Sequence, residues 1–198
     1  HASELILVLD FGSQYSQLIA RRIRELGVYS ELRGFNVSAA EIRRLAPSGI
    51  IFSGGPSSVY DKGAPLPDPE ILNLGIPVLG ICYGLQIIAY QKGGAVDPGA
   101  RREFGRADLV VEDNQSLFAG FDRAAIPVWM SHGDALTRVP EGFDRLARYG
   151  NSPISAIGDS VRKIYGVQFH PEVVHTPRGG EILRNFAFEI CGCRGGWD

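Results

Sequence analysis

The chain has 198 residues, a length that fits one domain with little left over. An apolar fraction of 44%, a charged fraction of 21% and a net charge of −2 are typical of a globular protein with a sizeable core, so they exclude intrinsic disorder, a coiled coil and the basic surface of a nucleic-acid-binding domain. No apolar run approaches the roughly 18 residues of a membrane span and no signal peptide opens the chain, so we expect no membrane partner.

The first half of the chain alternates short apolar runs with amphipathic segments. Residues 4–11 are predicted to form a buried strand, and residues 14–26 a helix whose apolar side chains recur at helical spacing. Ser38 and Glu41 match the capping box that opens a second helix. The same alternation predicts strands over 28–33, 49–53 and 77–81, and helices over 38–45, 69–74 and 83–92. Strands that alternate with helices predict βαβ units and a parallel sheet.

The pattern changes after Gly93 and Gly94, where strands follow one another with hardly a helix between them. A helix over 181–190 closes the chain, and residues 192–198 resemble the start of a linker. The predicted fold is α/β, an open and mostly parallel sheet flanked by helices. An antiparallel β portion in the C-terminal half is either layered onto this sheet or joined to it. The strands of that portion are predicted over 104–112, 126–130, 143–149, 153–157 and 163–169.

Cys82 lies in the sharpest local signal, the run Gly80-Ile81-Cys82-Tyr83-Gly84. An apolar strand enters a turn of small residues and a helix leaves it, which is the pattern of a nucleophile elbow with Cys in place of Ser. The start of the helix would favour a thiolate at this position. The alternative interpretation is a structural cysteine, because free cysteines are among the most buried residues.

His170, Pro171 and Glu172 supply the other two groups that a nucleophilic cysteine needs. Residues two apart in an extended segment point to the same face, and Pro171 biases His170 toward an extended conformation. The carboxylate can then bind one ring nitrogen and leave the other facing a thiol. A lone histidine is more often structural, but the combination with a separate cysteine elbow predicts a triad of Cys82, His170 and Glu172.

Gly54, Gly55 and Pro56 follow the predicted strand over 49–53. Ligands of an open parallel sheet bind outside the carboxyl ends of its strands, where the Cys82 elbow also emerges. The backbone N–H groups of Gly55 and Tyr83 are therefore candidates for an oxyanion hole. The alternative is an ordinary Gly-Pro turn.

Other polar residues have two open interpretations each. Gln86 lies one helical turn after Cys82, so its amide either faces the pocket or caps a neighbouring loop. His132 is either a second base or a polar loop residue in the run Ser131-His132-Gly133-Asp134.

The three cysteines are Cys82, Cys191 and Cys193, an odd number that argues against a disulfide framework and for a reducing, cytoplasmic compartment. We predict no metal site, because Cys191 and Cys193 have no partner pair of ligands.

These features together resemble the class I, triad-type glutamine amidotransferases, in the family's order and over nearly the whole chain. The resemblance implies hydrolysis of L-glutamine through a glutamyl thioester and transfer of the ammonia to a synthetase partner. It implies Cys82 as nucleophile, His170 as base and Glu172 as the residue that orients it. It also implies glutamine contacts from Gly54, Gly55, Pro56, Gln86, Ser131, His132, Gly133 and Asp134.

Two further segments, 10–15 and 129–134, are similar to a branch of the family in which an ATP-pyrophosphatase synthetase domain consumes the ammonia. The sequence has no Ser-Gly-Gly-Val-Asp-Ser phosphate loop, so we expect no cofactor in this chain and assign ATP and Mg²⁺ to the missing domain. One domain over 1–198 is expected, which is either excised from a longer enzyme or the small subunit of a two-chain enzyme. The ending near Trp197 resembles the linker of the fused form and favours excision, and a homodimer is one interpretation for the parent enzyme.

Three other functions stay open from the sequence. The chain is an amidotransferase subunit of another biosynthetic pathway, a cysteine hydrolase of the α/β-hydrolase type, or a non-catalytic regulatory domain with the same fold. Segments 10–15 and 131–134 count against the first, and the position of Glu172 directly after His170 counts against the second. The intact set of three catalytic residue types counts against the third.

Overall fold

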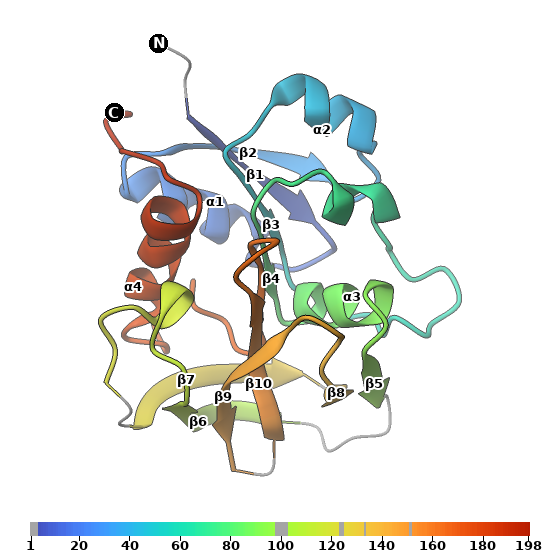
Figure 1. Ribbon diagram of the computed structural model, residues 1–198, viewed down its shortest axis with the longest axis vertical. Coiled ribbons are helices and arrows are strands. Elements are labelled where there is room, and N and C mark those ends of the chain that lie inside the picture. Colours follow the sequence, from blue (N-terminus) through green and yellow to red (C-terminus); the bar gives the residue numbers. More distant parts are fainter. Residues whose placement is uncertain (1–3, 98–102, 123–124, 133, 151) are drawn as a thin grey trace.

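The computed structural model describes residues 4–97, 103–122, 125–132, 134–150 and 152–198. One sheet of nine strands runs through it, with helices on both faces (Figure 1). The strands are β1 (Leu5–Asp10), β2 (Tyr29–Gly34), β3 (Gly49–Phe52), β4 (Val78–Ile81), β6 (Glu103–Val111), β7 (Ala125–His132), β9 (Asp144–Tyr149), β10 (Ser152–Asp159) and β11 (Ile164–Val167). Their order across the sheet is β2-β1-β3-β4-β11-β10-β9-β6-β7.

The sheet changes from parallel to antiparallel along its width. Strands β2, β1, β3 and β4 are parallel neighbours, as the sequence predicted. Strands β10, β9, β6 and β7 are antiparallel to their neighbours and continue the same sheet, so the added portion is joined to the parallel part rather than layered onto it.

β11, which the sequence placed in the antiparallel portion, is antiparallel to its neighbour β10 but joins the parallel strands on its other side. It runs parallel to β4, and Val167 is paired with Ile81 at the carboxyl ends of the two strands. Cys82 follows Ile81 directly, and His170 comes three residues after Val167. This pairing therefore brings the two predicted reactive residues to one edge of the sheet.

The core lies on both faces of the sheet. Along β1, Ile6 and Val8 belong to one buried cluster and Leu7 and Leu9 to the other, because successive side chains of a strand point to opposite faces. A strand that is buried on both sides is expected to be apolar throughout. The helices α1 (Ser16–Glu25) and α4 (Gly179–Arg184) cover the first face, and α2 (Ala39–Leu45) and α3 (Tyr83–Gln91) cover the second (Figure 1).

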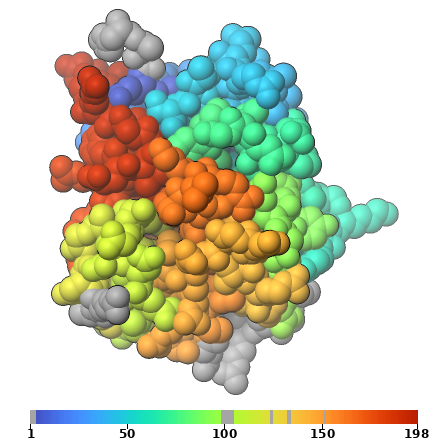
Figure 2. All heavy atoms as spheres, in the orientation of Figure 1, coloured from blue at the N-terminus to red at the C-terminus, as the bar shows by residue number. Residues whose placement is uncertain are grey.

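Short sequence motifs correctly predicted the start of α2 and the presence of a short helix after β3. The Ser38 hydroxyl accepts a hydrogen bond from the Glu41 backbone N–H at 3.1 Å, so the capping box that opens α2 is confirmed. The predicted short helix over 69–74 is the 3₁₀ helix η1 (Pro69–Asn73). Part of the segment between β3 and η1 projects from the body of the molecule (Figure 2).

Two parts of the fold differ from the sequence-based expectation. The strands β5 (Ala95–Asp97) and β8 (Ala135–Arg138) form a separate two-stranded sheet, and strands this short carry no alternating pattern. The predicted helix over 181–190 is α4 followed by a π-helix, η3 (Asn185–Ile190). The Cys191 N–H closes its wide last turn by donating to the Phe186 carbonyl, five residues back, at 2.9 Å.

The last residues of the chain pack against the fold, where the sequence suggested the start of a linker. The Trp197 N–H donates to the Gly27 carbonyl at 2.8 Å, and the Trp197 ring lies 5.5 Å from that of Tyr29. The Arg194 N–H donates to the Glu4 carboxylate at 2.8 Å.

Within the described residues, no helix is long and apolar enough to cross a membrane.

Candidate functional site

Cys82 lies at the sharp turn between β4 and α3, with φ 56° and ψ −107°. A positive φ is a strained conformation for any residue other than glycine. The two glycines of the run allow the turn, since a Cβ on Gly80 would lie 2.5 Å from the Gly84 carbonyl carbon and one on Gly84 2.5 Å from the Phe52 oxygen. The Cys82 N–H donates to the Val167 carbonyl at 2.8 Å, which ties the turn to β11. The strand-to-helix turn expected from the sequence is therefore present.

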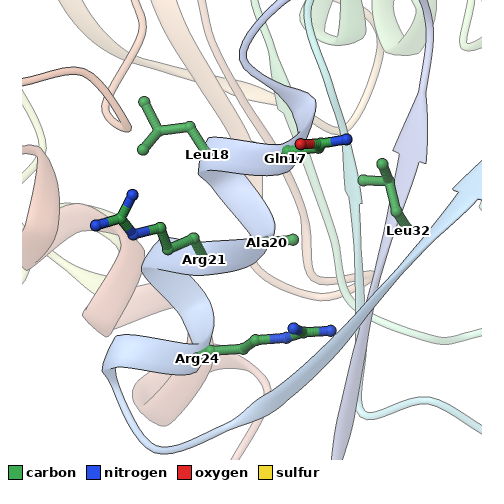
Figure 3. A pocket seen from close by; sticks show the side chains of 6 residues that line it. All are labelled: Gln17, Leu18, Ala20, Arg21, Arg24 and Leu32. Atoms are coloured by element: carbon green, nitrogen blue, oxygen red, sulfur yellow. The ribbon is translucent and has the colours of Figure 1, made fainter.

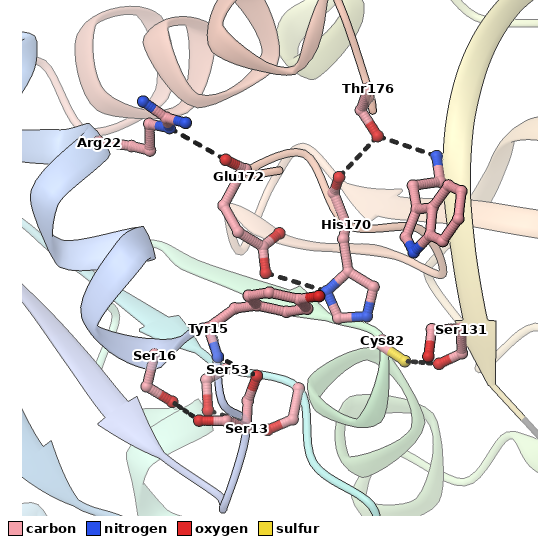
Figure 4. Close-up of polar contacts among 12 residues, drawn as sticks. Ser13, Tyr15, Ser16, Arg22, Ser53, Cys82, Ser131, His170, Glu172 and Thr176 are labelled. Atoms are coloured by element: carbon pink, nitrogen blue, oxygen red, sulfur yellow. Dashed lines mark hydrogen bonds and ion pairs between the residues drawn. The ribbon is translucent and has the colours of Figure 1, made fainter. Parts of the chain in front are cut away.

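His170 and Glu172 form a buried pair (Figure 4). His170 Nδ1 lies 2.9 Å from Glu172 Oε2, and the two side chains are 6% and 0% exposed. Three hydrogen bonds with neighbouring elements hold the His170–Glu172 segment in place. The His170 N–H donates to the Trp129 carbonyl at 3.0 Å, the Thr176 hydroxyl donates to the His170 carbonyl at 2.7 Å, and Arg22 Nε donates to the Glu172 carbonyl at 3.0 Å.

The electrostatics of this pair favour the imidazolium. Burial by itself would lower the pKa of His170, but hydrogen bonds to Cys82 and Glu172, together with their negative charges, outweigh burial and raise the pKa to about 10. Because Glu172 binds Nδ1, Nε2 is the ring nitrogen left to face the Cys82 sulfur. A histidine that is protonated at neutral pH and faces a thiol can stabilise a thiolate and can later give a proton to a leaving group.

Glu172→Gln should lower the pKa of His170, because it keeps the shape of the side chain but removes the negative charge. We expect the His170 ring to titrate at a lower pH in the variant than in the wild-type protein, as followed by the chemical shift of its Cε1 proton. Glutamine hydrolysis should fall, but less than on replacement of Cys82, since secondary members of a triad contribute less than the nucleophile.

The resonances of His132 and His175 serve as internal controls for that titration. An unchanged His170 midpoint in Glu172→Gln would show that another group sets the charge of the imidazole. A loss of hydrolysis as complete as that of Cys82→Ala would show that Glu172 does more than orient His170.

The Cys82 sulfur has polar neighbours from two strands. It donates to the Ser131 carbonyl at the end of β7, 3.2 Å away, and lies 3.7 Å from Gln168 Nε2, just beyond β11. Gln86 Nε2 donates to the Asp134 carbonyl at 3.3 Å, a contact that fits the interpretation in which its amide caps a neighbouring loop. Gly133 and the His132 side chain lie outside the described residues.

The loop of Gly54, Gly55 and Pro56 lies against both reactive side chains. A Cβ on Gly54 would be 3.1 Å from His170 Cε1 and 3.5 Å from Cys82 Cβ. One on Gly55 would be 2.4 Å from the Phe11 carbonyl oxygen, so the loop is packed tightly onto the turn after β1. Pro56 approaches the same turn at Gly12.

Tyr83 presents a backbone N–H at the Cys82 turn, while its side chain is engaged elsewhere. As the first residue of α3, its N–H has no partner within the helix and is available at the Cys82 turn. Its phenol is buried and donates to the Pro65 carbonyl at 2.9 Å. The structure thus brings Cys82, His170, Glu172, the Gly54 loop and the Tyr83 backbone together at one edge of the sheet.

Sequence reasoning missed several residues of this site. The Tyr15 ring meets the His170 ring edge-on, with centroids 5.6 Å apart, and belongs to the 10–15 segment that the sequence singled out. Asp10 orders that segment by accepting hydrogen bonds from the Gly12 N–H at 2.8 Å and the Ser16 hydroxyl at 2.9 Å. No sequence signal marks Arg22 or Thr176, which act through backbone carbonyls of the His170 segment.

The other candidate positions are poorly suited to metal binding or catalysis. In the described part of the chain, no group of three or more His, Cys, Asp or Glu side chains could hold a metal ion. Burial raises the pKa of Cys191 and of Cys193, which makes both poor nucleophiles. A hollow of about 610 Å³ beside α1 has no nucleophile or general base among its lining residues (Figure 3), which are Gln17, Leu18, Ala20, Arg21, Arg24 and Leu32.

Comparison with known proteins relates the chain to one family. Residues 7–190 match the family described as glutamine amidotransferase class-I. The glutamine-hydrolyzing GMP synthase of Enterococcus faecalis is 56% identical over 194 residues, which are 98% of this chain and 37% of that protein. The corresponding protein of a Synechococcus species is 55% identical over 194 residues, 98% of this chain and 36% of that protein. The chain thus spans little more than a third of these curated relatives.

Solved structures show the same fold. A protein of Thermoplasma acidophilum described as a GMP synthase subunit superposes with a TM-score of 0.87 at 31% identity, covering 97% of this chain and 96% of that one. A glutamine amidotransferase of Thermotoga maritima superposes with a TM-score of 0.76 at 18% identity, covering 98% of this chain and 100% of that one. At 18% identity, this second comparison shows only that the two proteins share a fold.

Proposed function

Because the chain belongs to the class I glutamine amidotransferases, we propose that it hydrolyses the side-chain amide of L-glutamine to glutamate and ammonia through a glutamyl thioester on Cys82. The observation that carries the proposal is the buried His170–Glu172 pair beside a cysteine held at positive φ. A nucleophile, a base and a residue that orients the base are the three parts of a triad.

The geometry supports a two-step reaction. The Cys82 thiolate attacks the amide carbon, and the N–H groups of Gly55 and Tyr83 stabilise the oxyanion that forms. The C–N bond breaks as the imidazolium of His170 protonates the leaving ammonia. The neutral imidazole then takes a proton from water, the resulting hydroxide attacks the thioester, and the thiolate leaves with glutamate as the product.

The loop of Gly54, Gly55 and Pro56 and the segment of Ser131, His132, Gly133 and Asp134 are proposed to contact glutamine. Support comes from the contact of Gly54 with His170 and from the hydrogen bond between Cys82 and the Ser131 carbonyl. Gln86 is proposed to contact glutamine as well, and its Nε2 also fixes the Asp134 backbone.

The ammonia is proposed to serve the amination of xanthosine monophosphate to GMP on an ATP-pyrophosphatase synthetase domain. Two curated relatives named GMP synthase support this, and in each the chain matches little more than a third of the protein. ATP and Mg²⁺ would bind in that other domain. We place the protein in the cytoplasm, where its three free cysteines would stay reduced.

A glutamine analogue that carries an electrophile tests the proposed nucleophile. It should label Cys82 and spare Cys191 and Cys193, because burial raises the pKa of both other thiols. Mass spectrometry of the three cysteine peptides measures the labelling, and excess free glutamine should protect Cys82. Equal labelling of all three cysteines would contradict the proposal that Cys82 is the nucleophile.

Addition of the separate synthetase domain should raise glutamine hydrolysis. A partner that stabilises the competent arrangement of the Gly54 loop shifts the population toward the active state. We expect the chain alone to bind glutamine, to hydrolyse it slowly and to form no GMP from xanthosine monophosphate and ATP. Glutamate release with and without the partner measures the effect, and equal rates in the two conditions would exclude activation by a partner.

A further inference from the structure

Gln168 is a buried polar side chain that the reaction described above does not use. It lies just beyond β11 and is 0% exposed. Its Nε2 approaches Cys82 Sγ at 3.7 Å, while its Oε1 has no hydrogen-bond partner among the residues that the structure describes. A buried acceptor without a partner is unfavourable, and an apolar side chain of similar size would fill the space without that cost. The amide therefore calls for an explanation other than packing.

The neighbours of the Cys82 sulfur differ in the protonation state that they favour. The Ser131 carbonyl, 3.2 Å away, can only accept a hydrogen bond, so it stabilises the protonated thiol. Gln168 Nε2 can donate one, so it stabilises the thiolate. His170, two residues further along the same segment, also stabilises the thiolate when its ring is protonated.

We propose that Gln168 is a positioning residue for the reacting sulfur, with its Nε2 donating a hydrogen bond to the Cys82 thiolate. The bond holds the sulfur beside His170 and raises the fraction of thiolate against the effect of the Ser131 carbonyl. The same bond stabilises the thiolate when it is expelled from the thioester. The inference rests on the proposed function, because it takes Cys82 as the nucleophile.

Gln168→Met keeps the length of the side chain and removes the donor. The test is the rate at which iodoacetamide alkylates Cys82 as a function of pH, followed by mass spectrometry of its peptide. The midpoint of this profile should move up by about one pH unit, which makes alkylation about tenfold slower below the midpoint. In glutamine hydrolysis, kcat should fall more than KM changes, because the bond is made to the nucleophile rather than to the substrate.

Gln168→Leu is the second variant, because it removes the donor without adding length or a buried charge. It leaves the thiolate without this hydrogen bond just as Gln168→Met does, so the midpoint should move up by a similar amount. Gln91→Met is the matched control. The amide of Gln91 is also half satisfied, with Nε2 donating to the Pro67 carbonyl at 3.2 Å and Oε1 unpaired among the described residues, and it lies at the far end of α3.

The expected result is a shifted profile for both Gln168 variants and an unchanged one for Gln91→Met. A folded Gln168→Leu, or a folded Gln168→Met, whose alkylation profile overlays that of the wild-type protein would overturn the inference. The readout needs no glutamine turnover. A shifted profile in a protein that does not hydrolyse glutamine would therefore count against the proposed function and leave the role of Gln168 standing.

Discussion

Cys82→Ala should lower glutamine hydrolysis by at least about 10⁴-fold, since loss of the nucleophile removes the covalent route and leaves only binding and the oxyanion hole. Alanine lacks the sulfur but places a Cβ at the same strained φ, so the turn between β4 and α3 should keep its shape. The measurement is the rate of glutamate release at saturating glutamine, with the fold checked by circular dichroism.

Cys191→Ala is the control for that experiment. Its thiol is packed against Gly49 and is a poor nucleophile, because burial raises its pKa. It should retain wild-type hydrolysis. An active Cys82→Ala, or an equal loss of activity in Cys191→Ala, would contradict the assignment of the nucleophile.

Gly55→Ala should lower hydrolysis by about 10²- to 10³-fold, the usual effect of losing one oxyanion-hole donor. The new Cβ would lie 2.4 Å from the Phe11 carbonyl oxygen, and a backbone atom cannot move aside as a flexible side chain can. The loop must therefore shift and carry the Gly55 N–H away from the Cys82 turn. The decrease should be in kcat, because the donor acts on charge that develops in the transition state.

Gly180→Ala in α4 is the matched control for Gly55→Ala. A Cβ at Gly180 meets no atom within 4 Å, and alanine has the higher helix propensity. This variant should keep full activity and equal or greater thermal stability. If Gly55→Ala were folded and fully active, the Gly55 N–H would have no role in the reaction.

The sequence predicted the parts of the fold and the site that depend on local patterns. The alternation of strands and helices, the capping box at Ser38 and the turn at Cys82 each rest on a few adjacent residues. The pairing of His170 with Glu172 was also predicted, although the premise of an extended segment was wrong: β11 ends at Val167, and Pro171 and Glu172 lie in a turn. In these cases the chemistry and the geometry are encoded within a few positions.

The remaining features depend on contacts between distant segments. No local pattern shows that β11 lies parallel beside β4, although this pairing brings His170 to Cys82. The Ser131 contact uses a backbone carbonyl, which every residue type has. Gln168 left a weak signal, a polar residue within an apolar predicted strand, but its meaning depends on the position of Cys82 in space.

The most direct test of the thioester route is to mix the protein with isotope-labelled glutamine, quench it in acid during turnover and analyse the peptide that contains Cys82. We expect a labelled glutamyl group on Cys82 that appears with the first ammonia released, decays as glutamate forms and is absent in Cys82→Ala. Ammonia and glutamate that rise together, with no glutamyl group on that peptide at any time, would contradict the thioester route.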